Sequence, residues 1–152
     1  MTRKDLGPRT IEALEELARA DFEEAMALER AAAGCASTGV TGHLRALARQ
    51  RRELARELRT HFEEGGVDAP ATRGLLETLR QVWLDLKRVV QRGDPQRVIE
   101  EVLGSEGELE RAYRDALHET AGSPLNALLM AHLRRIRADE QTLRTILATV
   151  GG

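Results

Sequence analysis

The chain has 152 residues; 41% are hydrophobic, 32% are charged, 3% are aromatic, and the formal net charge at pH 7 is −2. This length suits one domain with one core, so we expect residues 1–152 to form a single domain. Leu, Ala, Arg and Glu dominate, and these residues favour helices. Alternating runs typical of strands are missing. We therefore expect an all-α protein.

The balance of charges argues against a nucleic-acid partner. Arginines cluster at 49–52 and 134–137, but acidic residues are interspersed along most of the chain, which is typical of solvated helix faces. No stretch approaches the roughly 20 apolar residues that a membrane-spanning helix needs, and the first ten residues do not resemble a signal peptide. We expect a cytoplasmic protein that binds neither nucleic acid nor membranes.

Five helices are predicted from apolar residues that recur every three or four positions. Glycines follow the predicted helix ends, and prolines at positions 8 and 95 suit a first helical turn. A Ser-Pro pair at 123–124 gives the last start signal. The predicted helices span about Pro8–Ala33, Val40–Glu64, Arg73–Arg92, Pro95–Glu119 and, from that Ser-Pro pair, the segment up to Val150.

The lengths of the predicted connections indicate how these helices are arranged. The first and second helices, and the last two, are expected to be antiparallel neighbours. The helix at 73–92 returns the chain across the bundle, so the second and fourth helices point the same way. This is a ferritin-like four-helix bundle with an additional crossover helix. The crossover helix has a broad apolar face without charges, which also predicts a homodimer.

Four charged residues stand in the centres of the apolar stripes, near the helix midpoints. They are Asp21, Arg51, Glu106 and Asp139. Antiparallel packing would bring them into one polar layer halfway along the bundle. Charges are rarely buried unless they pair or bind a metal, so this layer is the candidate functional site.

One interpretation of the layer is a buried salt-bridge network centred on Arg51, whose five donors can serve several carboxylates. Three carboxylates around one arginine leave two excess negative charges. A protonated His132, a protonated carboxylate or one bound cation could offset them. A different helical phase also stays open, above all if Gly104-Ser105 kinks the fourth helix.

The other interpretation is a single divalent metal ion, held by Glu106, His132 and Asp139, with Glu140 at the edge of the same stripe. A di-metal site of the ferritin type needs two Glu-x-x-His motifs, and the chain has none. Arg51 would also repel a metal, because it is a fixed cation. No cofactor other than such a metal ion is expected. Because no hydrolase triad or phosphate-binding loop occurs either, an enzyme is not expected.

Several segments resemble a bacterial family of uncharacterised ferritin-like four-helix-bundle proteins. They are Gly65-Gly66 with Pro70 and Gly74, the run Trp83-Leu84-Asp85-Leu86-Lys87, Glu106 with Tyr113-Arg114-Asp115-Ala116-Leu117, and the positions of Asp21 and Arg51. The resemblance extends over 11–147 and implies a ferritin-like fold without an assigned reaction. Family members tend to have a histidine where this chain has Glu140, which makes a metal less expected here.

The sequence thus favours a non-catalytic structural or interaction protein with ion pairs in place of a di-metal site. The alternative is a metal-binding ferritin-like protein, with iron, manganese or zinc, or a weak oxidase. An adaptor that presents arginine-rich helices to a protein partner also stays open.

Overall fold

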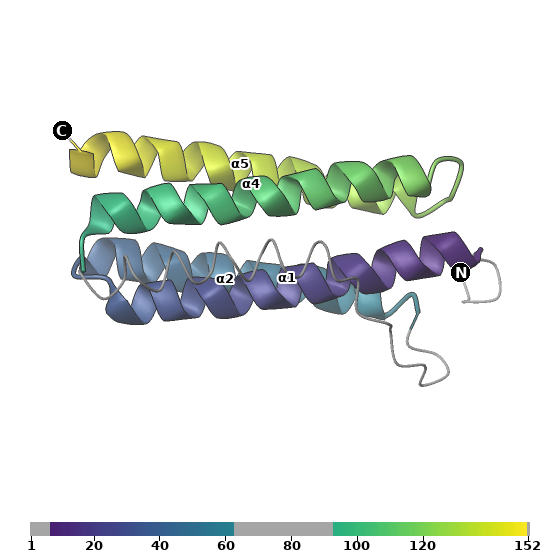
Figure 1. The fold of residues 1–152 in the computed structure, drawn as a ribbon, viewed down its shortest axis with the longest axis horizontal. Helices are drawn as coiled ribbons and strands as arrows, with labels where there is room; N and C mark the ends of the chain where they lie inside the picture. The colour runs from purple at the N-terminus through teal and green to yellow at the C-terminus, as the bar shows by residue number, and fades with distance from the viewer. Residues whose placement is uncertain (1–6, 63–92, 152) are drawn as a thin grey trace.

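The computed structural model describes residues 7–62 and 93–151, which form four helices (Figure 1). The helices are α1 (Pro8–Gly34), α2 (Thr38–Arg59), α4 (Pro95–Glu119) and α5 (Asn126–Gly151). Within these two ranges no strand occurs, so the described chain is all-α. The helix predicted at 73–92, and with it the crossover, lies outside the described residues.

The start of α2 is set by a side-chain cap. The backbone N–H of Val40 donates to the Ser37 hydroxyl at 3.3 Å, so α2 begins two residues earlier than the predicted Val40. The helix ends at Arg59 and a turn follows at 60–62, so the predicted end at Glu64 is too late.

The other helix ends also follow local chemistry. At the start of α4, the Asp94 carboxylate accepts from the Gln96 N–H at 3.1 Å, and Pro95 is the first helical residue. Gly93 has a φ of +70°, a conformation that favours glycine. Its carbonyl accepts from the Ala36 N–H at 3.1 Å, which ties the α1–α2 connection to the beginning of α4. α4 is helical from 95 to 119, as predicted, and this range includes Gly104-Ser105, where a kink was expected.

Figure 1 shows the course of the chain through the bundle: α1 and α2 are antiparallel, α4 and α5 are antiparallel, and α2 and α4 run in the same direction. α1 packs against both α2 and α4, and α4 packs against α5. The contact between α2 and α5 is slight. No helix in the described ranges has both the length and the apolar character needed to cross a membrane.

The apolar core has two parts. The Tyr113 cluster lies toward the α4–α5 connection and contains Leu14, Leu17, Leu58, Leu109, Tyr113, Leu129 and Ile136 among its buried members. The Leu44 cluster lies toward the α1–α2 connection and contains Leu28, Leu44, Leu47, Val98, Ile99, Val102 and Leu143. The boundary between them falls at 21–26, 49–53, 104–108 and 137–142, one stretch in each helix.

Candidate functional site

Arg51 lies in the boundary between the two apolar clusters and is fully buried. Its Nε donates to Glu106 Oε2 at 3.2 Å, and its Nη2 pairs with the other oxygen of the same carboxylate. Glu106 is also fully buried. This two-pronged pairing joins α2 to α4. Burial alone would lower the pKa of Arg51, but the Glu106 carboxylate beside it raises that pKa above its ordinary value.

The same guanidinium reaches a third helix. Its Nη1 lies 3.1 Å from Oδ2 of Asp139 in α5, whose side chain is 15% exposed. Neither of these two atoms makes a well-aligned hydrogen bond, so the contact is an ion pair without a directional bond. At the outer edge, Arg135 Nε lies 3.8 Å from Asp139 Oδ1. Arg51 therefore links α2, α4 and α5.

Asp21 is fully buried in α1, and its partner is a tyrosine. Its Oδ2 is hydrogen-bonded to the Tyr113 hydroxyl of α4, and its Oδ1 makes no hydrogen bond. Burial raises the pKa of Asp21 to about 8, although Tyr113 and Arg51 act in the opposite direction. At neutral pH this carboxyl group therefore holds its proton. That proton removes one of the two excess negative charges expected for the layer.

A second buried carboxyl group, Glu24, is one that the apolar stripe did not predict. It is 1% exposed, and its Oε2 accepts from the Ser105 hydroxyl at 2.8 Å. The same hydroxyl lies 2.9 Å from the Val102 carbonyl, so its one proton serves either acceptor. Burial, followed by the nearby Glu106, raises the pKa of Glu24 well above its ordinary range. The signal in the sequence was a glutamate three positions after Asp21, on the same helix face.

His132 faces away from Arg51, toward the Tyr113 cluster. Its Nδ1 lies 3.1 Å from the Tyr113 hydroxyl, and its Nε2 lies 2.7 Å from Glu57 Oε2 at the surface of α2. The residue is 3% exposed, and burial lowers its pKa below the ordinary value. A neutral His132 therefore does not supply the positive charge that sequence analysis considered.

Glu140 is buried beside the layer and points toward other carboxylates. It is 5% exposed, and its Oε2 lies 3.4 Å from Arg144 Nη2. Burial, followed by the neighbouring Glu110, raises the pKa of Glu140 to about 7. Glu140 is thus on the inward side of α5, one position after Asp139.

The four residues considered as metal ligands do not form one ligand set. Both ring nitrogens of His132 are engaged by Tyr113 and Glu57, and the guanidinium of Arg51 lies between Glu106 and Asp139. Among the residues that the structure describes, no group of three or more His, Cys, Asp or Glu side chains is placed to hold a metal ion. The centre of the layer is occupied by the guanidinium of Arg51, a fixed cation.

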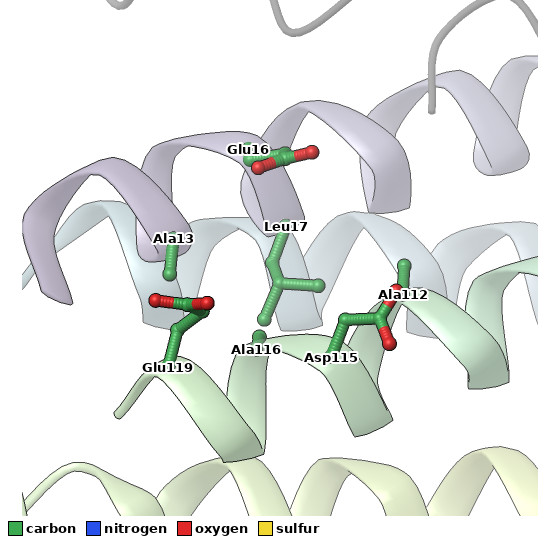
Figure 2. Close-up of a pocket in the computed structure, with 7 residues that line it drawn as sticks. All are labelled: Ala13, Glu16, Leu17, Ala112, Asp115, Ala116 and Glu119. Carbon is green, nitrogen blue, oxygen red and sulfur yellow. The ribbon is translucent and has the colours of Figure 1, made fainter. Parts of the chain in front are cut away.

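A small hollow of about 90 Å³ lies between α1 and α4, outside the polar layer. Figure 2 shows Ala13 and Leu17 of α1 above Ala112 and Ala116 of α4, with carboxylate side chains around them. These short side chains form an apolar floor and contribute no group that could carry out chemistry. The hollow therefore adds nothing to the candidate site.

Comparison with known proteins gives one family. A family described as a domain of unknown function (DUF2383) matches residues 9–119, which include α1, α2 and α4. Neither the curated proteins nor the solved structures gave a match. The matched range contains Asp21, Arg51 and Glu106 and ends before α5. Since the match extends over most of the chain, the protein belongs to the DUF2383 family.

Proposed function

We propose that this DUF2383 protein is a non-catalytic structural or interaction protein in which an ion-pair layer stands in place of a di-metal site. The observation that supports the proposal is the fully buried Arg51, which pairs with both oxygens of Glu106 and with Asp139. A fixed cation at the centre of the carboxylates repels a metal ion and satisfies the carboxylates itself.

The charges of the layer are consistent with this role. With a proton on Asp21, the guanidinium faces the two carboxylates it contacts, Glu106 and Asp139. Buried ion pairs often add little stability compared with apolar side chains, but breaking one is costly. The layer would therefore fix the register of the helices, because only one alignment gives every buried charge its partner.

We also propose a ferritin-like topology, a homodimer and a cytoplasmic location. The shared direction of α2 and α4 supports the topology, because α2 ends and α4 begins at opposite ends of the bundle (Figure 1). The dimer is expected from the apolar residues at 73–92, which lie outside the described residues. Analytical ultracentrifugation at micromolar protein concentrations tests the dimer, and a monomer alone would contradict it.

Elemental analysis separates the proposal from its alternative, a metal-binding ferritin-like protein or weak oxidase. The protein would be purified without chelators and its iron, manganese and zinc contents measured. We expect contents far below one metal ion per chain. One metal ion per chain, retained after dialysis, would contradict the ion-pair proposal and favour the alternative.

Two neighbouring arginines provide a matched test of the layer. Arg51→Leu leaves the fully buried Glu106 without its cation, and we expect a loss of about 3–5 kcal/mol in the free energy of unfolding. Arg52 pairs with Glu29 at the surface, where both side chains are about a third or more exposed. Arg52→Leu should therefore cost less than about 1 kcal/mol. Equal losses in urea denaturation would contradict a special role for Arg51.

A further inference from the structure

A continuous series of hydrogen bonds leads from the buried Asp21 to the protein surface. Asp21 is bonded to the Tyr113 hydroxyl, which lies 3.1 Å from His132 Nδ1. The other ring nitrogen of His132, Nε2, lies 2.7 Å from Glu57. The side chains are buried at Asp21, Tyr113 and His132 and 55% exposed at Glu57. The series crosses four helices and ends in solvent.

The outer end of the series opens into a groove between α2 and α5. This groove has a volume of about 380 Å³, and Glu57, Gln50 and Arg135 are among the residues that line it. It occurs where α2 and α5 make only slight contact. Water in the groove therefore reaches Glu57, whereas Asp21 at the other end is fully buried.

We propose that Tyr113, His132 and Glu57 form a proton path that exchanges the proton of Asp21 with solvent. Tyr113 and His132 can each give and receive a proton, and the Glu57 carboxylate can accept one at the surface. A proton relay needs groups of this kind. The proposal is independent of the ion-pair function and adds a proton-dependent change to the same layer.

The transfer leaves every intermediate group with its original number of protons. In the structure the Tyr113 hydroxyl donates to Asp21. When Asp21 carries a proton this direction is reversed: Asp21 donates to Tyr113, Tyr113 donates to His132 Nδ1, and Nε2–H donates to Glu57. The Nε2 proton then leaves through Glu57 to water. His132 takes the Tyr113 proton at Nδ1, and Tyr113 takes the Asp21 proton. Asp21 alone becomes ionised, and Tyr113 now donates to it.

Charged groups from the other helices face Asp21 and determine its proton affinity. Arg51 of α2 favours the ionised form of Asp21, and Glu106 of α4 opposes it. Burial dominates and raises the pKa of Asp21 to about 8, so the proton is exchanged near neutral pH. Glu24 lies on the same helix one turn away; burial and the nearby Glu106 raise its pKa, and the Ser105 hydroxyl that donates to it acts in the opposite direction.

The groups around the rest of the path keep its intermediates neutral. Burial raises the pKa of Tyr113 well above its ordinary value, with Asp21 acting in the same direction. Burial lowers the pKa of His132; Arg51 and His61 lower it too, and Glu57 opposes them. Neither intermediate is therefore charged for long, as expected of groups that pass a proton onward.

Ionisation of Asp21 changes the centre of the bundle. A third negative charge then acts on Arg51, in competition with its pairing to Glu106 and Asp139. The layer would hold its ion pairs most firmly below pH 8 and loosen above it. Through this path the buried Asp21 exchanges its proton with solvent while the bundle stays folded.

A pH-jump experiment tests the path, because Tyr113 is the chain's single tyrosine and its near-ultraviolet absorbance reports its hydrogen bonding. A stopped-flow jump from pH 6.5 to 9.5 should give one relaxation phase in the full-length protein. Asp21→Asn should abolish this phase. His132→Gln should keep its amplitude but slow it roughly tenfold or more, because exchange must then wait for local opening.

A second pair of variants tests the surface end without disturbing the core. Glu57→Gln should slow the same phase, whereas Glu53→Gln, one turn earlier in the same groove, should leave it unchanged. Unchanged rates in both His132→Gln and Glu57→Gln would overturn the proposal. So would a relaxation phase that survives in Asp21→Asn. The Glu57 pair keeps the test decisive if His132→Gln does not fold.

Discussion

The two apolar clusters differ in what they enclose. The Leu44 cluster is built from aliphatic side chains and alanines. The Tyr113 cluster is of similar size but surrounds a hydroxyl group that is bonded to Asp21 on one side and His132 on the other. On one side, therefore, the polar layer borders apolar side chains, whereas on the other side a series of hydrogen bonds links it to solvent. A buried hydroxyl is tolerated only where it has partners, and here both partners titrate.

The largest expected effects come from leucines, one in each cluster. Leu28→Ala in the Leu44 cluster and Leu129→Ala in the Tyr113 cluster remove fully buried side chains. Each should lower the free energy of unfolding by about 2–5 kcal/mol. Because the polar layer separates the two sites, the losses in the double variant should add within about 0.5 kcal/mol. Urea denaturation of the four proteins measures this, and strong coupling would show that the clusters form one core.

The next largest effect is the dependence of stability on pH, which arises from the buried carboxyl groups at the boundary between the two clusters. The pKa of Asp21 is raised from 3.8 to about 8 in the folded protein, so its contribution is present below pH 4 and is lost as the pH rises through 8. Glu24 and Glu140 act in the same direction. His132, whose pKa is lowered, acts oppositely but only below about pH 6.5.

Thermal or urea denaturation should therefore show stability falling between pH 6.5 and 8. Asp21→Asn replaces the neutral carboxyl by an amide of the same shape and should make this fall shallower. A wild-type stability that rises over this range would contradict the raised pKa values. An unchanged slope in Asp21→Asn would assign the fall to Glu24 and Glu140 alone.

A smaller loss is expected when the hydroxyl group of the Tyr113 cluster is removed. Tyr113→Phe keeps the ring but leaves Asp21 without its hydrogen-bond partner, and it should cost about 1–3 kcal/mol at pH 7. A stability equal to that of the wild type would show that water replaces the hydroxyl.

The smallest expected effect lies at Glu24. Ser105→Ala removes the hydroxyl that Glu24 accepts from and should cost about 1 kcal/mol. Its neighbour Gly104 is exposed in the same helix, with nothing within 4 Å of an added Cβ. Gly104→Ala should therefore stabilise α4 by up to about 1 kcal/mol. Effects of the same sign at both positions would contradict the assigned role of Ser105.

Periodicity in the sequence carried much of the information about the helices. Apolar spacing and capping residues predicted four of the helices now described, with the largest error at the end of α2, where a turn at 60–62 replaces helix. The same spacing put Asp21, Arg51, Glu106 and Asp139 on apolar stripes, since an inward position depends only on the helical repeat. The predicted helix at 73–92 lies outside the described residues.

The spacing within one helix does not determine which side chains of other helices a residue contacts. Sequence analysis considered His132 as a metal ligand or a cation, and in the structure its nitrogens face Tyr113 and Glu57. It also passed over Glu24, because a residue at the edge of a stripe is buried only if the neighbouring helix offers a partner such as Ser105.

The sequence by itself determined that the described chain is helical and that Asp21, Arg51 and Glu106 take inward positions, because both follow from local spacing along the chain. Only the tertiary structure decided which polar groups are partners: Arg51 pairs with Glu106 and Asp139, and Asp21 is hydrogen-bonded to Tyr113. Partner choice depends on the rotation and approach of separate helices, and burial between them sets where each proton resides.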